Sequence, residues 1–210
     1  VHNGLVIVFF SLYSLSVNRY KRINYLDKKA LRRLSSRDAL TGIYNRHRFE
    51  EELRRAIKHA QRYDTQLSLV LFDIDNFKQF NDKYGHLPGD ELLIMFADII
   101  RQNIRKEDLA IRYRGEEFLI LIRNLELDLA VSVAERIRRQ LEKKRIQFDI
   151  NGIVWNVTAS CGIAQYPVHS NNIFKVIEYA DKALYYAKSM GKNSVVTYDQ
   201  ILSDANRQGK

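Results

Sequence analysis

Cysteine is almost absent from this sequence: Cys161 is the only one in 210 residues, so no disulfide can form within the chain. Such sparse use of cysteine is typical of proteins from a reducing, cytoplasmic compartment. Cys161 stands in an apolar, strand-like run, which predicts a small core residue.

Several functional motifs are missing as well. The sequence has no Gly-rich phosphate loop of the dinucleotide or P-loop type, no Cys/His pattern for a metal and no internal repeat. It also lacks a run of Lys and Arg interleaved with aromatic residues, the pattern that follows a nucleic-acid backbone. These absences argue against Rossmann-type, P-loop and zinc enzymes, and they weaken a nucleic-acid-binding function.

The overall composition is that of a globular protein, with 28% charged and 46% apolar residues. The length suits one domain of ordinary size with an appendage. Lys and Arg outnumber Asp and Glu by 34 to 25, a net charge of +9. This excess favours an anionic partner: a nucleic acid, a nucleotide or a membrane surface.

The first segment, Gly4–Val17, carries no charge and is followed by Arg19, Lys21 and Arg22. A bilayer-spanning helix needs about 20 apolar residues, so this stretch is too short alone. We expect residues 1–17 to be the remnant of a transmembrane helix, with the basic cluster on the cytoplasmic side of an inner membrane. The alternative is an amphipathic helix that is buried or packed against a partner.

Residues 18–35 have the spacing of a linking, signalling helix, with a seam formed by Ile23, Leu26, Ala30 and Leu34. The seam lasts fewer than three heptads, so a plain surface helix explains it equally well. The pattern breaks between Ser36 and Gly42, where we place the domain boundary. We expect the domain to occupy residues 36–199 and a tail to occupy residues 200–210.

Within the domain, helical and strand-like patterns alternate. Helices are predicted for residues 46–63, 76–84, 88–103, 127–144 and 172–190, and strands for residues 67–72, 153–166 and 194–198. Residues 111–122, IRYRGEEFLILI, have apolar arms around a short Gly-containing break and predict a β-hairpin, and Asn151-Gly152 predicts a second hairpin turn. Helix 88–103 would open with Pro88, with Asp90 and Glu91 in its first turn. The fold class is therefore α/β, with a mixed central sheet flanked by helices.

Carboxylates stand at two of the predicted strand ends. Asp73 and Asp75 follow the apolar run LSLVLF, and Glu116 and Glu117 crowd the hairpin tip. Oxygen ligands of this kind suit Mg²⁺, and two such ions can assist a phosphoryl transfer. The simpler alternative for the tip is an ordinary exposed turn.

Five sequence blocks, in order, together resemble the GGDEF-domain diguanylate cyclases: LTGIYNR, FDIDNFKQFND, GHLPGD, RYRGEEF and ADKALYYAKSMGKN. The resemblance covers about residues 36–199. It implies a fold like the polymerase palm and the class III nucleotidyl cyclases. It also implies condensation of two GTP into cyclic di-GMP, with release of two pyrophosphates.

The resemblance also implies roles for individual residues. Asp73, the carbonyl of Ile74 and Glu116 match the ligands of two Mg²⁺ (or Mn²⁺) ions, and Glu116 matches the acceptor of the 3′-hydroxyl proton, with Glu117 close by. Lys78 matches a lysine that stabilises the transition state. Matches to substrate-binding positions are Asn81, Asp90, Gly115, Lys188 and Lys192, the last commonly an Arg in the family. His86 matches without a defined role, while Phe77 and Phe80 are expected in the core.

Asn81 and Asp90 correspond to the guanine readers. A carboxylate accepts from the two neighbouring donors on guanine's edge, whereas adenine presents an acceptor at N1. Asp90 therefore argues for GTP over ATP.

One departure stands in the signature motif, where Arg114 replaces the first of two glycines. If this position needs a left-handed conformation, Arg costs about 1–2 kcal/mol. Arg114 would also bring a guanidinium toward a triphosphate.

Arg105 and Asp108 form an RxxD pattern before the hairpin, as in the family's inhibitory product site, and Arg136 resembles an arginine that completes that site. Three functions therefore compete. The first is an active, product-inhibited cyclase that works as a homodimer. The second is an inactive receptor that binds cyclic di-GMP through Arg105 and Asp108. The third, a polymerase-like nucleic-acid binder, is suggested only by the fold and the charge of +9, so we expect no nucleic-acid partner.

Overall fold

The computed structural model describes residues 13–14, 17–22, 25, 36–147 and 154–208. The chain divides into two compact units, Val1–Ser36 and Arg37–Lys210. Described residues of the first unit up to Tyr25 are helical. No helix within the described ranges is long and apolar enough to cross a membrane. Most of the first segment, Gly4–Val17, lies outside these ranges. So do all four residues of the predicted seam, Ile23, Leu26, Ala30 and Leu34. Both expectations therefore stay predictions.

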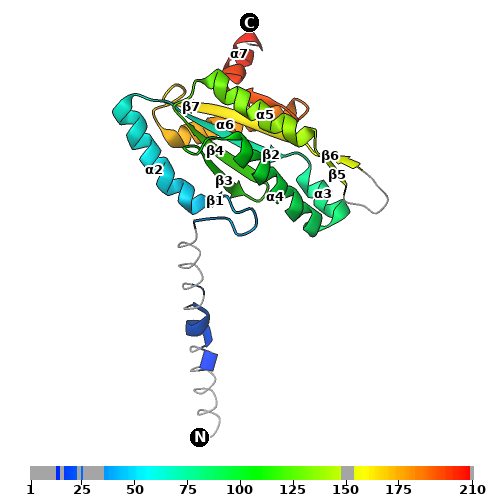
Figure 1. Cartoon of the computed structure of the whole chain (residues 1–210). Helices are drawn as coiled ribbons and strands as arrows, with labels where there is room; N and C mark the ends of the chain where they lie inside the picture. Colours follow the sequence, from blue (N-terminus) through cyan, green and yellow to red (C-terminus); the bar gives the residue numbers. More distant parts are fainter. Residues whose placement is uncertain (1–12, 15–16, 23–24, 26–35, 148–153, 209–210) are drawn as a thin grey trace, which may run out of the picture. The chain divides into compact units, whose positions relative to one another are not determined.

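A six-stranded mixed sheet forms the centre of the second unit (Figure 1). Its order is β1 (Tyr44–Asn45), β3 (Leu109–Arg114), β4 (Glu117–Arg123), β2 (Leu67–Ile74), β7 (Ala159–Tyr166) and β8 (Val195–Thr197). The pairs β1–β3 and β7–β8 are parallel, and the other neighbours are antiparallel. The predicted mixed sheet flanked by helices is confirmed.

Helices cover both faces of this sheet and create a core on each side. On one face lie α3 (Phe77–Tyr84), α4 (His86–Asn103) and α5 (Leu127–Glu142). On the other lie α2 (Arg46–Tyr63) and α6 (Ile173–Ser189). Helices α2 and α6 each begin at an asparagine, Asn45 and Asn172, whose side chain accepts a hydrogen bond from the first turn. This capping explains why both predicted helices start where they do.

Strand β2 is the central element, because it is hydrogen-bonded on both sides and all eight of its residues are buried. Its side chains alternate between the two cores: Val70 and Phe72 face one, Leu69 and Leu71 the other. This double burial explains the continuous apolar run in the sequence. Cys161 on β7 is fully buried, and Phe77 and Phe80 lie in the core, as predicted.

Three boundaries differ from the sequence-based expectation. The strand expected over residues 153–166 is two strands: β6 (Val154–Asn156) pairs with β5 (Arg145–Gln147) in a separate ribbon, and β7 begins at Ala159. Helix α4 begins at His86, after Gly85 with a φ of 90°, so Asp90 lies beyond the first turn. Residues expected as a tail form α7 (Tyr198–Gln208), where Tyr198 stacks on Tyr179 of α6. The predicted Asn151-Gly152 turn lies outside the described residues.

Gly162 allows α6 to approach β7 at backbone distance. A β-carbon at this position would lie 2.1 Å from the carbonyl oxygen of Ala180 and 2.2 Å from the amide nitrogen of Leu184. Both atoms belong to the helix backbone, which cannot move aside without shifting the whole helix.

We therefore expect Gly162→Ala to lower the free energy of unfolding by at least about 1–3 kcal/mol, the usual cost of overpacking. Urea denaturation followed by circular dichroism measures this change. The matched control is Ala164→Gly on the same face of β7, which removes one methyl group and should cost only about 1 kcal/mol. Equal stability of Gly162→Ala and the parent protein would contradict the close packing.

Candidate active site

Two acidic segments meet at one end of the sheet. Strands β2 and β4 run antiparallel with Asp73 directly opposite Glu117, and Asp73 faces Ser160 of β7 on its other side. Glu116 precedes β4 in the hairpin turn, and its charge raises the pKa of Asp73. The structure thus brings together the strand-end and hairpin carboxylates that the sequence only placed on separate elements.

Asp73 is a desolvated carboxylate, with only 6% of the residue exposed. Burial raises its pKa, and repulsion from Glu116 and Asp75 adds to this rise. The ammonium of Lys188, 2.8 Å from Oδ2 of Asp73, opposes the rise without cancelling it. Burial likewise raises the pKa of Glu117, and Asp73 adds to the effect. The end of β2 is therefore a place where negative charge is held at a cost.

The donor set at this end of the sheet fits a hard divalent cation. Asp73, Glu116 and the carbonyl of Ile74 offer oxygen only, as Mg²⁺ prefers. Among the described residues, no three His, Cys, Asp or Glu side chains form a ready-made metal cluster. A magnesium site made of few carboxylates plus substrate phosphates needs no such cluster. A bound cation would relieve the repulsion between the buried Asp73 carboxylate and the half-buried Glu116.

Asp75 has a different role from Asp73, although the two stand two residues apart. Its carboxylate accepts hydrogen bonds from Thr158 Oγ1 (2.7 Å), Ser160 Oγ (2.7 Å) and the amide of Asn193 (3.0 Å). Asp75, which the sequence offered beside Asp73 as a candidate for the same site, therefore has its carboxylate occupied inside the protein. It follows the last residue of β2 and connects that segment to the start of β7 and to the loop of Asn193.

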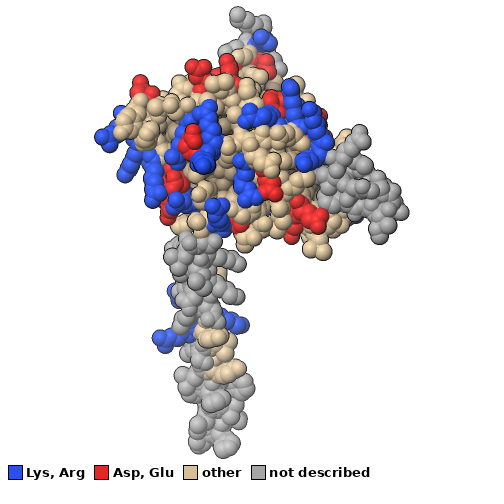
Figure 2. Space-filling model, viewed as in Figure 1, with Lys and Arg blue, Asp and Glu red and all other residues tan. Residues whose placement is uncertain are grey.

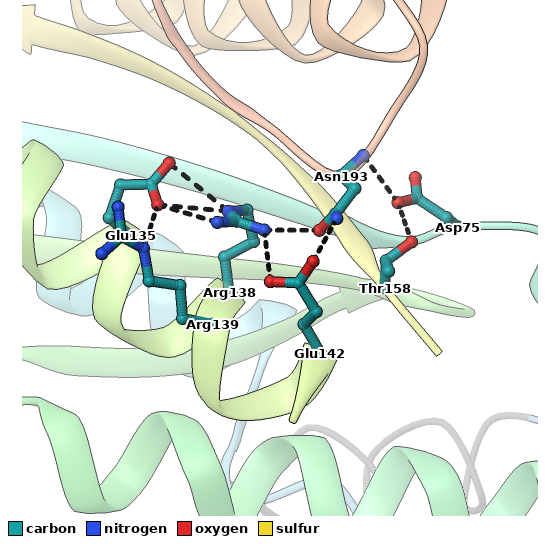
Figure 3. A network of polar contacts seen from close by, with 7 residues as sticks. All are labelled: Asp75, Glu135, Arg138, Arg139, Glu142, Thr158 and Asn193. Carbon is teal, nitrogen blue, oxygen red and sulfur yellow. Dashed lines mark hydrogen bonds and ion pairs between the residues drawn. The ribbon is translucent and has the colours of Figure 1, made fainter. Parts of the chain in front are cut away.

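A polar network extends from Asp75 through Asn193 to α5 (Figure 3). Arg138 donates to the side-chain oxygen of Asn193 (2.6 Å) and forms ion pairs with Glu142 and Glu135. The side-chain nitrogen of Asn193 donates to Glu142 (2.7 Å). Sequence reasoning missed this network. The only signal for it was Asn193 at the end of the block ADKALYYAKSMGKN.

The network fixes the loop that carries Lys192. Gly191, Lys192 and Asn193 have consecutive positive φ values of 112°, 65° and 47°. Two non-glycine residues in this region are unfavourable by themselves, so the bonds of Asn193 are needed to hold them. Lys192 then reaches Asn76 after β2, with its ammonium 2.6 Å from Oδ1. Both predicted phosphate-binding lysines, Lys188 and Lys192, thus contact the segment at the end of β2.

The predicted guanine readers lie on adjacent helices. The side chain of Asn81 on α3 packs against Gly89 of α4, the neighbour of Asp90. A β-carbon on Gly89 would lie 1.9 Å from Oδ1 of Asn81. That oxygen is buried and has no hydrogen-bond partner among the described residues. An unpaired buried acceptor is costly, so this contact between α3 and α4 stores an unsatisfied polar atom.

Two further predicted residues, Lys78 and His86, make no described contact with the carboxylates at the end of β2. Lys78, the second residue of α3, is exposed and makes no hydrogen bond or ion pair within the described part of the chain. His86, the first residue of α4, is also exposed. A long, unconstrained lysine can reach a substrate, but the structure gives Lys78 no fixed position.

The hairpin tip accommodates Arg114 without left-handed strain. Gly115 has a φ of 36°, whereas Arg114 is not among the described residues with positive φ. The Arg114 guanidinium lies over the ring of Tyr113 at 5.4 Å, and that of Arg46 on α2 lies 5.3 Å from the same ring. Arg114 and Glu117 line a cleft of about 340 Å³ between α2 and α6. The expected strain at position 114 is therefore absent.

The RxxD residues line a second cleft, of about 370 Å³, together with Arg37, Arg101 and Lys106. Asp108 is 8% exposed, and its carboxylate accepts from the amides of Arg105 (3.0 Å) and Arg123 (3.2 Å). It therefore shapes the loop that presents the exposed Arg105.

Arg136 lies elsewhere on the domain. It borders a cleft on α5 and donates to the side chain and carbonyl of Asn103, both at 2.7 Å. The structure does not bring Arg136 to Arg105 within one chain.

Figure 2 shows basic side chains over α2 and α5, interspersed with acidic ones rather than forming a continuous groove.

The comparison with protein families decides the classification. The family described as "Diguanylate cyclase, GGDEF domain" matches residues 35–194. The chain belongs to the GGDEF family.

Several relatives of this GGDEF domain are named as diguanylate cyclases. Diguanylate cyclase A of Treponema denticola is 37% identical over 174 residues, covering 81% of this chain and 46% of the relative. Diguanylate cyclase DgcS of Shewanella oneidensis is 40% identical, covering 74% of this chain and 50% of the relative. The chain thus spans about half the length of these relatives.

Solved structures show the same fold. The coiled coil and GGDEF domain of DgcB from Caulobacter crescentus, in complex with c-di-GMP, matches with a TM-score of 0.74 and 29% identity. That match covers 89% of this chain and 99% of the other. The active GGEEF domain of a diguanylate cyclase from Vibrio cholerae matches with a TM-score of 0.68 and 31% identity, covering 73% of this chain and 96% of that one.

The raised pKa of Asp73 predicts that the ionised form of this carboxylate lowers the free energy of unfolding of the GGDEF domain. A carboxyl whose pKa is raised on folding binds its proton more tightly when folded, so its ionised form destabilises the fold at neutral pH. We expect Asp73→Asn to raise the melting temperature at pH 7 in metal-free buffer. The gain should shrink as the pH falls through the raised pKa and vanish below the unfolded value.

Calorimetry or a fluorescence melt from pH 7 to pH 3.5 measures this difference. Asp38 provides the opposite control, because hydrogen bonds from Thr41 and the ion pair with Arg112 outweigh burial and lower its pKa. Asp38→Asn should therefore lower the melting temperature at pH 7. A melting temperature for Asp73→Asn below that of the parent at pH 7 would show that the site does not strain the fold.

Proposed function

We propose that this domain condenses two GTP into cyclic di-GMP, with release of two pyrophosphates, using Mg²⁺ or Mn²⁺. The observation that carries the proposal is the register of β2 and β4, which sets Asp73 opposite Glu117 with Lys188 against the same carboxylate. The buried Asp73, the half-buried Glu117 and the two predicted phosphate-binding lysines suit a metal-assisted phosphoryl transfer. The names of the relatives point to the same reaction.

The residues divide the work of this transfer. Asp73, the carbonyl of Ile74 and Glu116 would hold two metal ions, which polarise the phosphate and acidify the attacking hydroxyl when bound. Glu116 accepts the proton of the 3′-hydroxyl, and Glu117 adds negative charge beside it. Positive charge for the triphosphate and the transition state comes from Lys78, Lys188 and Lys192, while Gly115 lets the hairpin backbone approach the phosphates.

Base recognition falls to Asn81 and Asp90. The Asp90 carboxylate can accept from the N1–H and the exocyclic amine of guanine, and the amide side chain of Asn81 would supply a further polar contact to the base. Adenine lacks this pair of donors, so a site built to pair with them rejects ATP through groups left unsatisfied.

Catalysis requires two copies of the domain. One domain has one set of these residues, but the product joins two nucleotides, so two sites must face each other in a homodimer. A parallel pair of linking helices would raise the local concentration of the domains. Attachment of the domain to the cytoplasmic side of a membrane stays a prediction that rests on Gly4–Val17.

Product inhibition would act through the RxxD loop. Arg105 is exposed in a cleft with three other basic residues, a setting that suits phosphate and the guanine Hoogsteen edge. Arg136 is bonded to Asn103, two residues before Arg105, but borders a separate cleft on α5, so it would contact product held by a neighbouring domain. A product bridge of this kind would keep two active sites apart.

Removing the catalytic carboxylate tests the activity. With purified, product-free protein, GTP and Mg²⁺, we expect Glu116→Gln to lower the initial rate of cyclic di-GMP formation by roughly 10²–10⁴-fold, because both a metal ligand and a proton acceptor are lost. Glu51→Gln on the exposed face of α2, outside the described clefts, is the matched control and should keep the parental rate. Labelled GTP resolved by chromatography gives the measurement.

The parent protein decides between cyclase and receptor in the same assay. A parent that binds cyclic di-GMP but forms none at any GTP concentration would overturn the proposed activity. Arg114→Gly would then show whether the altered signature residue is responsible.

The inhibitory loop is tested by Arg105→Ala. We expect this variant to bind cyclic di-GMP at least tenfold more weakly in calorimetry, since an exposed charged contact to the ligand is lost. Initial GTP turnover should be unchanged, and product should accumulate further. The control Arg54→Ala removes the same charge from α2, outside the described clefts. Unchanged product affinity in Arg105→Ala would show that this loop is not the product site.

A further inference from the structure

We propose that Lys188 is an exchangeable internal cation: it neutralises Asp73 before a metal binds, and metal binding displaces its ammonium toward the substrate phosphates. The inference rests on the proposed function, because it takes Asp73 as a metal ligand. It goes beyond that function by giving one lysine two successive positions and by coupling metal binding to phosphate binding.

The geometry places Lys188 where a cation is needed. Lys188 lies in the last turn of α6, and its ammonium is 2.8 Å from Oδ2 of Asp73. The acids that act on Asp73 are Glu116, Asp75 and, across the strand pair, Glu117. Asp75 is already saturated by three donors and Glu116 brings only further negative charge. Within the described residues, Lys188 is the single cation paired with Asp73.

A metal ion and the lysine cannot share this carboxylate favourably. A magnesium ion on an Asp73 oxygen would lie about 2.1 Å from it, a shorter distance than the one Lys188 now has. Two positive groups on one carboxylate would then repel each other at short range in a partly buried site. Metal binding at this carboxylate therefore favours departure of the Lys188 ammonium, which now holds Oδ2.

Lys188 can leave at little cost to the fold. Its side chain is 36% exposed, while that of Asp73 is 9% exposed, so the lysine moves into solvent more easily than the aspartate. A lysine is a compact charge on a flexible stem, unlike the planar fork of arginine, and it can swing between two acceptors. Once displaced, the ammonium is free to pair with phosphate oxygens.

The exchange makes metal and phosphate assist each other. Without nucleotide, the metal must break the Lys188–Asp73 pair and leave the ammonium without an anionic partner. With nucleotide, the phosphates supply the new partner, so the same displacement costs less. By thermodynamic linkage, metal must then strengthen nucleotide binding by the same factor.

Lys192 provides the matched control, because it has the same charge and the same predicted ligand. Its ammonium rests on the amide oxygen of Asn76 at 2.6 Å, a neutral group that is not a predicted metal ligand. Removing Lys192 should weaken nucleotide binding without releasing a metal ligand. Only Lys188 should affect the binding of metal alone.

The experiment measures Mn²⁺ binding to product-free protein by electron paramagnetic resonance, without nucleotide. We expect Lys188→Met to bind Mn²⁺ about tenfold more tightly than the parent, because the competing cation is gone. Lys192→Met should bind Mn²⁺ within about twofold of the parent. With a non-hydrolysable GTP analogue, both variants should bind nucleotide more weakly, and the enhancement of Mn²⁺ affinity by nucleotide should shrink in Lys188→Met alone.

Two results would overturn the exchange. The first is a Mn²⁺ affinity in Lys188→Met that is unchanged or weaker than in the parent. The second is an equal increase of Mn²⁺ affinity in Lys192→Met, which would indicate a general effect of charge. If Lys188→Met fails to fold, as judged by circular dichroism, the ε-carbon resonance of Lys188 in the parent gives the answer. Added Mg²⁺ should shift that resonance without nucleotide, and a resonance that does not respond would refute the exchange.

These outcomes are separate from the proposed activity. If the parent forms cyclic di-GMP but Lys188→Met binds Mn²⁺ with the affinity of the parent, the exchange is rejected and the cyclase activity is kept. Tighter Mn²⁺ binding in a domain that forms no cyclic di-GMP would keep the exchange and reject the cyclase.

Discussion

The burial of an ionised carboxylate at the end of the central strand is the constraint on which the rest of this site depends. Asp73 is held between β4 and β7 by a ladder that continues along the whole of β2, so it cannot turn away into solvent. Leaving such a charge uncompensated is expensive, because burial penalises the charged form. The lysines, the acidic hairpin and the packing of α6 all lie where they can respond to that charge. The fold thus keeps a strained site ready for a cation instead of relaxing it.

Neighbouring residues in this site have separate tasks. Asp73 is available to a ligand, whereas Asp75 is fully used inside the protein by donors from residues 158–160 and 193. The Asn193 bonds to Arg138 and Glu142 connect the loop of Lys192 to α5. The bonds of Asn193 inside the protein therefore determine where the predicted phosphate-binding Lys192 can lie. Much of the precision of such a site lies in these supporting contacts.

The sequence predicted the elements better than the contacts between them. Helix α2 and strand β2 were predicted almost completely, because an asparagine cap and an uninterrupted apolar run are local signals. The division between β6 and β7 was not, since VWNVTAS favours strand throughout and the break before Ala159 coincides with a bond from Thr158 to the distant Asp75. The role of Asp75 could not be predicted, because its partners lie more than 80 positions away in the chain. The position of Arg136 likewise depends on Asn103, 33 residues earlier.

The contact between Asn81 and Gly89 has a consequence for how base recognition can be altered. Gly89 lies within α4 with helical geometry, so its backbone does not require glycine; the side chain of Asn81 does. A larger residue at position 89 would push the Asn81 side chain out of its present place between the two helices. If Asn81 reads the base, as proposed, a substitution at position 89 would alter base recognition from the neighbouring helix without itself contacting the nucleotide.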